Sequence, residues 1–264
     1  MRLALIGFGG LGSIVAQHLR DDRSVQLVAV AARGHQADSV RALLGDVSVV
    51  QSVDDLLAAG PQLVVECASH GAFRQYAEPV LGAGIDLVAV SVGVLADAPY
   101  RARVRETAAA GGASLEIPAG AIGAIDVVAA ARIAGLTRVA YVTRKSPRAW
   151  SGTPAEAMID LPRVSEPALF FDESAERAAL VFTDKANVCA TLALAGVGFD
   201  KTRVQFWVDP AVNKSIHHIE AAGACGTLSI DLANDVAPSN GKASLLTAMS
   251  IVRAVRNRTA ALRL

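Results

Sequence analysis

The sequence has 264 residues, and its charges cancel, with 25 Lys and Arg against 25 Asp and Glu. Hydrophobic residues make up 52% of the chain, aromatic residues 5% and charged residues 19%. This composition excludes a disordered chain, which would be polar and unbalanced in charge. It also argues against a nucleic-acid partner, because such proteins usually carry a basic excess or a basic stripe.

The apolar runs of the chain are too short to cross a membrane. The longest, LVAVAA at 27–32 and LVAVSVGVLA at 87–96, fall well below the roughly 18 residues of a spanning helix. The opening MRLALIGFGG leads into glycines rather than a cleavage site, so we expect no targeting segment and a cytoplasmic protein. Cys67, Cys189 and Cys225 form no CxxC pair, which argues against a disulfide framework or a zinc site.

Up to residue 117, short apolar runs alternate with segments of helical periodicity. We expect strands at 3–6, 25–31, 47–50, 63–67, 86–90 and 113–117. We expect helices between them, at 11–20, 39–44, 53–59, 70–82 and 100–110. Strands this apolar are covered on both faces, so the pattern predicts an α/β fold with a doubly wound parallel sheet.

The pattern changes near Pro118. A loop leads into an Ala-rich helix, and a polar, proline-containing stretch occupies 146–173. Strands with alternating polarity are expected at 137–144, 203–208, 217–222 and 226–232, and a last helix at 243–259. Alternation indicates a sheet with one solvated or partner-facing side. We therefore expect a nucleotide-binding domain at 1–118, an α+β catalytic and dimerisation domain at 119–242, and a terminal helix at 243–264 that packs on the first domain.

The segment Gly7-Phe8-Gly9-Gly10-Leu11-Gly12 is a GxGxxG motif between an expected strand and an expected helix. In this context Gly7 permits a tight turn, Gly9 lets the backbone approach a pyrophosphate, and Gly12 lets the helix pack on the strand. Free N–H groups at the start of the helix, including those of Gly10 and Leu11, would meet the phosphates. The motif therefore predicts a Rossmann fold that binds a dinucleotide.

The acidic residue that usually follows the second strand, and that binds the adenosine ribose, is absent. The strand ends in two alanines followed by Arg33. An arginine can pair with a 2′-phosphate and stack on adenine, which favours NADP or dual use of NAD and NADP. The alternative is that Arg33 is a solvated loop residue.

Ligands of open α/β sheets lie at the carboxyl ends of the strands. Glu66, Cys67, Ala68 and Ser69 end one such strand, and the backbone of this segment is expected to line the cofactor while the Glu66 and Cys67 side chains are structural. In the second domain, Asn187 stands near the start of an Ala-rich helix. His217 and His218 share one strand, so they point to opposite faces, and spacing does not choose between them.

The chain resembles the L-aspartate dehydrogenase family almost from end to end. The similar segments are GFGGLG (7–12), ECAS (66–69), SVGVL (91–95), IPAGAIGAID (117–126), DKANVCATLALAG (184–196), VDPAVNKSIHHIEAAGACG (208–226) and PSNGKASLLTAMS (238–250). The resemblance implies a homodimer that uses NAD or NADP to oxidise L-aspartate to iminoaspartate for NAD biosynthesis. It also implies that His217 is the catalytic residue and that Ala121 and Asn187 contact the cofactor.

Two positions depart from the family pattern: Ala119 replaces a serine, and Gly241 stands where the family has a proline-containing segment. Aspartate carries two carboxylates, and Lys185, Lys214 and Lys242 are uncommitted candidates to bind them. Alternative interpretations are another two-domain oxidoreductase, such as homoserine dehydrogenase or dihydrodipicolinate reductase, and a nucleotide-binding protein without catalysis. The SIHHIE segment argues against the reductase.

Overall fold

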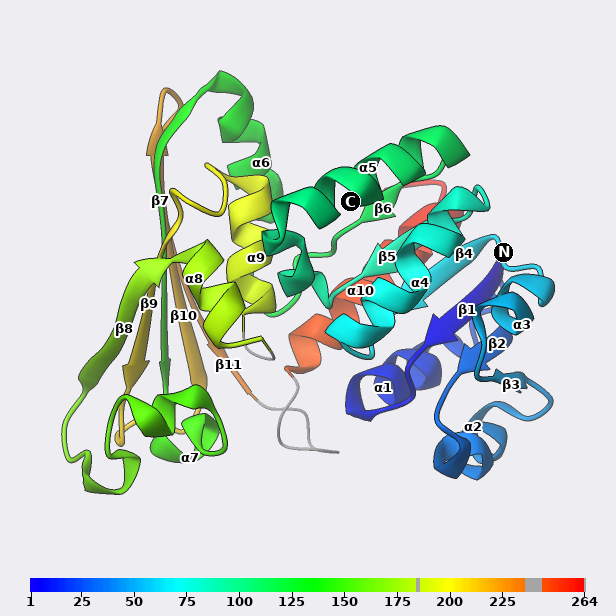
Figure 1. Ribbon diagram of the computed structural model, residues 1–264, viewed down its shortest axis with the longest axis horizontal. Coiled ribbons are helices and arrows are strands. Elements are labelled where there is room, and N and C mark those ends of the chain that lie inside the picture. The colour runs from blue at the N-terminus through cyan, green and yellow to red at the C-terminus, as the bar shows by residue number, and fades with distance from the viewer. Residues whose placement is uncertain (184–185, 236–243, 264) are drawn as a thin grey trace. The chain divides into compact units, whose positions relative to one another are not determined.

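The computed structural model describes residues 1–183, 186–235 and 244–263. The chain divides into two compact units, one formed by Met1–Pro118 with Thr247–Leu264 and the other by Ala119–Leu246 (Figure 1). Each unit is described by itself.

The first unit contains six parallel strands in the order β3-β2-β1-β4-β5-β6. They are β1 (Arg2–Ile6), β2 (Gln26–Ala31), β3 (Ser48–Val50), β4 (Leu63–Glu66), β5 (Asp86–Ala89) and β6 (Leu115–Glu116). This is the order of a dinucleotide-binding Rossmann sheet, in which the direction of winding reverses between β1 and β4. The predicted doubly wound parallel sheet is confirmed.

Helices connect these strands. They are α1 (Gly10–Leu19), α2 (Ala37–Leu44), α3 (Val53–Ala58), α4 (His70–Gly82) and α5 (Ala98–Gly111). Their starts follow local chemistry, because Ser52, Ser69 and Asp97 each accept a hydrogen bond from a backbone N–H of the first turn. Short 3₁₀ turns, η1 (Gly34–Gln36) and η2 (Val92–Ala96), follow β2 and β5.

The terminal helix α10 (Leu245–Thr259) belongs to the first unit from Thr247 onward. In Figure 1 it lies behind the strands, whereas α4 and α5 lie in front of them. Arg258 donates to Asp86 and to Glu116, at 2.7 Å from the latter, and Arg256 pairs with Asp22 at 3.1 Å. Ala243, the expected first residue of this helix, lies outside the described residues.

The second unit contains a mixed five-stranded sheet in the order β11-β10-β7-β9-β8. Its strands are β7 (Leu136–Lys145), β8 (Ala168–Ser174), β9 (Arg203–Val208), β10 (Ser215–Gly223) and β11 (Gly226–Asn234). Strands β7 and β9 are parallel and the other pairs antiparallel. The sequence did not predict β8, because this edge strand lies in the polar stretch at 146–173.

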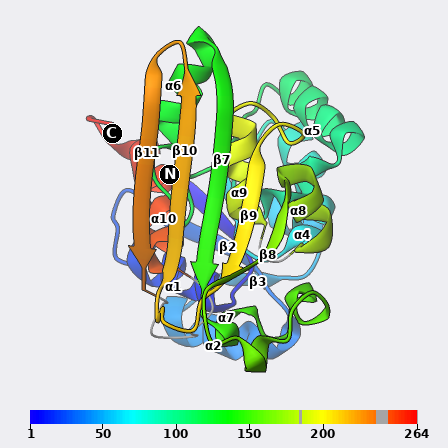
Figure 2. The ribbon, with the colours of Figure 1, turned by 90° about the vertical axis from the view of Figure 1, so that its left-hand side faces the viewer.

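Helices α6 (Ile125–Ala134), α8 (Ala175–Val181) and α9 (Asn187–Ala195) pack on one face of this sheet. Figure 2 shows the strands with these helices behind them and the opposite face toward the viewer. Beside the sheet, the short helix α7 (Pro147–Trp150) inserts Trp150 into a cluster with Phe170, Phe182 and Phe206. The Trp150 indole N–H donates to the Trp207 carbonyl at 3.0 Å, so its one polar atom is satisfied inside this core.

Candidate functional site

The glycine loop stands at the carboxyl edge of the first sheet, between β1 and α1. Gly7 has a φ of +97°, and a Cβ there would lie 2.6 Å from the Cβ of Ala68. A Cβ on Gly12 would lie 2.1 Å from the Gly7 carbonyl oxygen. Both positions therefore require glycine, one for the turn and one for the close packing of helix on strand.

Gly9 has a different reason to be glycine. A Cβ there would have no atom of the described residues within 4 Å, so this part of the structure leaves the space open. Gly9 precedes α1, no described side chain caps that helix, and its first turn contains no acidic residue. The N–H groups of Gly10, Leu11 and Gly12 at this helix start can bind an anion. The open space, the uncapped helix and the turn together fit the pyrophosphate of a dinucleotide.

Arg33 stands two residues after the last residue of β2, Ala31, and is exposed. The strand register pairs Ile6 with both Ala31 and Glu66, which places the residues after β1, β2 and β4 at one edge of the sheet. Gln36 links two of these loops, since its side-chain amide donates to the Phe8 carbonyl at 3.0 Å. Arg33 therefore stands on the same edge as the glycine loop, where an adenosine phosphate could meet it.

The segment after β4 is held by a buried carboxylate. Glu66 is 1% exposed. Its Oε1 accepts from the N–H groups of Ala68 at 2.7 Å and Ser69 at 3.0 Å, and from the Ser91 hydroxyl at 2.8 Å. Its Oε2 accepts from the Ser91 N–H at 3.1 Å. One side chain thus fastens the ends of β4 and β5 together.

Cys67 serves packing in this segment. Its thiol contacts the Ile6 carbonyl at 3.5 Å and would lie 3.2 Å from a Cβ on Gly12. Burial, followed by the charge of Glu66, raises the pKa of the Cys67 thiol, so the reactive thiolate is disfavoured. The side chain of Cys67 is therefore structural, and the role of its backbone beside a cofactor stays a prediction.

The second unit separates the two adjacent histidines. His217 points to the helix-covered side of β10 and is 3% exposed. His218 points to the opposite face, where it contacts Asp231 at 2.8 Å and Glu220 at 3.2 Å. The hydrogen bond to Glu220 raises the pKa of His218 despite some burial. Only His217 is therefore a buried imidazole.

His217 has one hydrogen bond among the described residues. Its Nδ1 lies 2.6 Å from the hydroxyl oxygen of Tyr141 on β7. Burial, and then the positive charge of Lys145, lowers the pKa of His217 to about 3. The imidazole is consequently neutral at physiological pH and still has a lone pair.

Tyr141 and Lys145 are the residues that sequence reasoning missed here. Tyr141 is 2% exposed, and Lys145 ends β7 with its ammonium 5.1 Å from the Trp150 ring centre. Burial, and then Cys189 of α9, raises the pKa of Tyr141, and the charge of Lys145 acts on the pKa of Cys189 against the effect of burial. Alternation from Tyr141 to Lys145 along one strand was the available signal, but the sequence does not show which strand lies beside β10.

The other residues that the sequence predicted for the site lie in different parts of the second unit or outside the described residues. Asn187 opens α9, two residues before Cys189, and the Ala121 carbonyl accepts from the Asn234 side chain at 2.5 Å. Lys214 is paired with Asp235 at 3.1 Å. Lys185, Lys242 and Gly241 lie outside the described residues. In the described ranges no His, Cys, Asp and Glu cluster could hold a metal ion, and no helix is long and apolar enough to cross a membrane.

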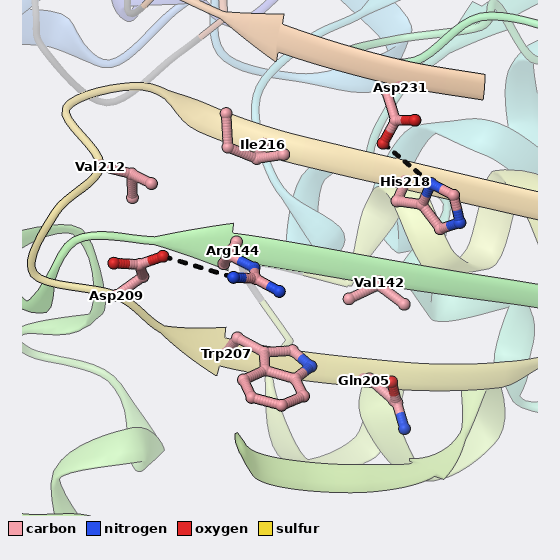
Figure 3. A pocket seen from close by; sticks show the side chains of 9 residues that line it. All are labelled: Val142, Arg144, Gln205, Trp207, Asp209, Val212, Ile216, His218 and Asp231. Atoms are coloured by element: carbon pink, nitrogen blue, oxygen red, sulfur yellow. Dashed lines mark hydrogen bonds and ion pairs between the residues drawn. The ribbon is translucent and has the colours of Figure 1, made fainter. Parts of the chain in front are cut away.

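The open face of the second sheet carries a shallow hollow (Figure 3). Val142, Ile216 and Trp207 line it beside two charged pairs, Arg144 with Asp209 and His218 with Asp231. The Arg144 guanidinium lies 5.2 Å from the Trp207 ring centre. The hollow and the His217–Tyr141 pair are on opposite sides of the sheet, so they are different sites.

Comparison with known families matches the two parts of the chain separately. Residues 126–258 match the family model described as aspartate dehydrogenase, C-terminal. Residues 7–118 match the model described as homoserine dehydrogenase, NAD binding domain. The second match agrees with the NAD(P)-binding geometry of the glycine loop, and the first distinguishes this chain from homoserine dehydrogenases.

Full-length relatives agree with that division. An L-aspartate dehydrogenase of Ralstonia nicotianae is 40% identical over 98% of this chain and 97% of that protein, and one of Polaromonas sp. is 42% identical over 99% of both. The solved aspartate dehydrogenase of Thermotoga maritima has the same fold, with a TM-score of 0.77 at 24% identity over 100% of this chain and 99% of that one. The chain belongs to the L-aspartate dehydrogenase family of NAD(P)-dependent amino-acid dehydrogenases.

Proposed function

We propose that this protein oxidises L-aspartate to iminoaspartate with NAD or NADP, and that it supplies the imine to NAD biosynthesis. The observation that carries the proposal is a buried, neutral imidazole, His217, in the unit that matches the aspartate dehydrogenase family. The imine can otherwise hydrolyse to oxaloacetate and ammonia, so the biosynthetic role requires its capture by a following enzyme.

The first unit would hold the cofactor. The N–H groups of Gly10, Leu11 and Gly12 would bind the pyrophosphate above the open Gly9 position. The backbone of Cys67, Ala68 and Ser69, fixed by Glu66, would line the same edge. From the second unit, the resemblance assigns Ala121 and Asn187 to the cofactor as well.

His217 would accept a proton from the substrate ammonium. The chemistry that NAD(P)⁺ supplies when bound is acceptance of a hydride, here from C2 of aspartate. With a pKa of about 3 in the free protein, His217 is a weak base. Two substrate carboxylates near the ring would raise that pKa, because adjacent negative charge favours the imidazolium. Proton acceptance would thereby depend on the presence of the dicarboxylate.

Lys145 is the cation that we assign to a substrate carboxylate. Its charge already acts on His217 and Cys189, so it stands in the electrostatic surroundings of the imidazole. The flexible stem of a lysine could bring the ammonium to a carboxylate oxygen. Lys145→Met would then raise the KM for aspartate with little change in the Kd for NADPH.

Initial rates with purified enzyme test the proposed function. L-Aspartate, D-aspartate, L-glutamate and L-homoserine are compared with NAD and with NADP. We expect the highest kcat/KM with L-aspartate. Activity on homoserine without activity on aspartate would overturn the assignment, and tight cofactor binding without turnover of any of the four would indicate a protein that only binds the nucleotide.

Cofactor choice is tested at Arg33. Arg33→Asp places a carboxylate where NAD-specific folds usually have one, so we expect a loss of roughly tenfold or more in kcat/KM for NADP and a smaller change for NAD, in line with one lost charge-assisted contact. Equal changes for both cofactors would show that Arg33 is only a solvated loop residue.

The resemblance also supports a cytoplasmic homodimer. We propose the open face of the second sheet as the dimer contact, because Val142, Ile216 and Trp207 present apolar surface there among charged side chains. Sedimentation of the wild type should give a dimer, and Trp207→Asp should shift it toward the monomer. If the Trp207→Asp variant remains dimeric, the dimer contact does not lie on this face of the sheet.

A further inference from the structure

The phenol of Tyr141 and the imidazole of His217 form an isolated buried pair between β7 and β10. Tyr141 pairs in register with Ile219 and His217 with Thr143, so the two rings are diagonal neighbours on one face of the sheet. The ring planes differ by 21°, with centres 5.9 Å apart. The hydroxyl oxygen reaches Nδ1 at 2.6 Å. Such a short contact between two buried side chains fixes the orientation of the imidazole.

We propose that Tyr141 is a positioning residue for the reaction: its oxygen accepts the Nδ1–H of His217 and so leaves the lone pair on Nε2. This inference rests on the proposed function, in which His217 accepts a proton. A neutral imidazole has one N–H and one lone pair. If Tyr141 donated to Nδ1, Nε2 would carry the hydrogen and could accept nothing.

Thr143 does not compete for the phenol oxygen of Tyr141. Its hydroxyl donates its only hydrogen to the Ile216 carbonyl at 3.0 Å, so it has no hydrogen left to give to a neighbouring side chain. The phenol oxygen is therefore left to accept from the Nδ1–H of His217.

The surroundings keep both rings neutral in the free protein. Burial, with Cys189 adding to it, raises the pKa of Tyr141 well above its usual value, so the phenol keeps its hydrogen. Burial, and then the charge of Lys145 on β7, disfavours an imidazolium at His217. When His217 takes a proton on Nε2, Nδ1–H still donates to the same phenol oxygen. Neither ring therefore needs to reorient during proton transfer.

The first test reads the tautomer in the wild-type protein. Long-range ¹H–¹⁵N spectra of protein with ¹⁵N-labelled histidine distinguish a protonated from an unprotonated ring nitrogen, and His217→Gln identifies the signals. We expect Nδ1 protonated and Nε2 unprotonated at neutral pH without substrate. The opposite tautomer would overturn the proposal. The measurement needs no turnover, so it stays valid even if aspartate proves not to be the substrate.

The second test removes the hydroxyl. In Tyr141→Phe we expect the N–H to move to Nε2 in a large fraction of molecules and kcat to fall about tenfold or more, less than the 10²- to 10⁴-fold of losing a base itself. The Kd for NADPH, from its fluorescence, should stay within about twofold of the wild type, since the Tyr141 phenol is bonded to the imidazole and is not assigned to the cofactor.

A further variant controls the result. Tyr100→Phe removes a buried hydroxyl that has no partner in the described part of the chain, and it should leave both kcat and tautomer unchanged. If Tyr141→Phe is folded, by its Tm, and retains kcat within twofold, Tyr141 has no positioning role.

Discussion

Glu66 in the first unit and His217 in the second are both almost completely buried, at 1% and 3% exposure. Glu66 accepts four hydrogen bonds from two loops. Among the residues that the structure describes, His217 has one hydrogen-bond partner, Tyr141. A buried polar group whose capacity is used up holds structure in place, whereas one with unused capacity remains open to a ligand. Glu66 therefore serves to hold two loops in place, whereas the buried His217 is available for chemistry.

We expect the greatest loss of activity when the His217 imidazole is removed. His217→Ala should lower kcat on aspartate by about 100-fold or more, the range for removal of a general base, while the Kd for NADPH changes little. His218→Gln is the matched control, because the neighbouring ring points to the other face of β10. A kcat of His217→Ala within about threefold of wild type would remove His217 from the proton-transfer step.

The next prediction tests the structural role of Glu66. Glu66→Gln replaces an acceptor oxygen with an amide that must face at least one of the present donors, which should lower the free energy of unfolding by about 1–3 kcal/mol. The Ala68 and Ser69 backbone would also lose its fixed position, so NADPH should bind more weakly. Urea unfolding and fluorescence titration measure both changes.

Glu78→Gln is the matched control for that substitution. Glu78 forms a partly exposed pair with Arg103 at 3.4 Å, and such pairs contribute about 0–1 kcal/mol. If Glu66→Gln lowers the free energy of unfolding no more than Glu78→Gln does, the four hydrogen bonds of Glu66 contribute little to stability.

The two residues should also give stability opposite dependences on pH. The folded-state pKa of His217 is lowered from 6.5 to about 3, so its neutral form stabilises the fold above about pH 6.5, and this contribution is lost as the pH falls. Between pH 7 and pH 5 the loss is about 2 kcal/mol. His217→Gln should show a correspondingly flatter decline in urea unfolding; an unchanged slope would contradict the assignment of a neutral buried imidazole.

Glu66 has the reverse sign. Burial raises its pKa, although its hydrogen bonds oppose the change. Its contribution is therefore full below about pH 4.5, the ordinary value, and is lost as the pH rises through the folded-state pKa. In Glu66→Gln the free energy of unfolding should fall less with rising pH in that range than in the wild type. The same urea series checks this, and parallel curves would argue against it.

We expect the smallest change when a single hydrogen-bond donor to Glu66, the Ser91 hydroxyl, is removed. Ser91→Ala removes one donor hydroxyl and keeps the Ser91 backbone N–H, so we expect a loss of about 0.5–1.5 kcal/mol and a Kd for NADPH within about twofold of wild type. If Ser91→Ala lowers the free energy of unfolding as much as Glu66→Gln does, the hydroxyl, rather than the three backbone N–H groups, holds the two strand ends together.

Much of the fold followed from apolar periodicity. The parallel strands of the first unit are continuous apolar runs, and the boundaries 203–208 of β9 match the observed strand. The edge strand β8 was missed because its residues, such as Asp172 and Glu173, are partly exposed and carry polar side chains. Long polar stretches hide edge strands, since only one side of such a strand has a partner.

Only part of the candidate site could be predicted from the sequence. The glycine loop and Arg33 could be found because they follow predicted strands at a known spacing along the chain. Tyr141 was missed because 76 positions separate it from His217, and only the register of β7 on β10 brings them together. The assignment of Ala121, Asn187 and the cofactor-edge residues to particular contacts remains a prediction.

The family, the parallel sheet and the positions that require glycine can all be read from the amino-acid sequence, because they depend on local spacing and on matches along the whole chain. The sequence also showed that His217 and His218 must face opposite sides. Which of the two is buried depends on the face of β10 that the helices cover, and this becomes visible only in the folded protein. The folded protein also shows that a phenol, rather than solvent, contacts Nδ1 of His217. Burial and hydrogen-bond direction belong to packed neighbours, and those neighbours come from distant parts of the chain.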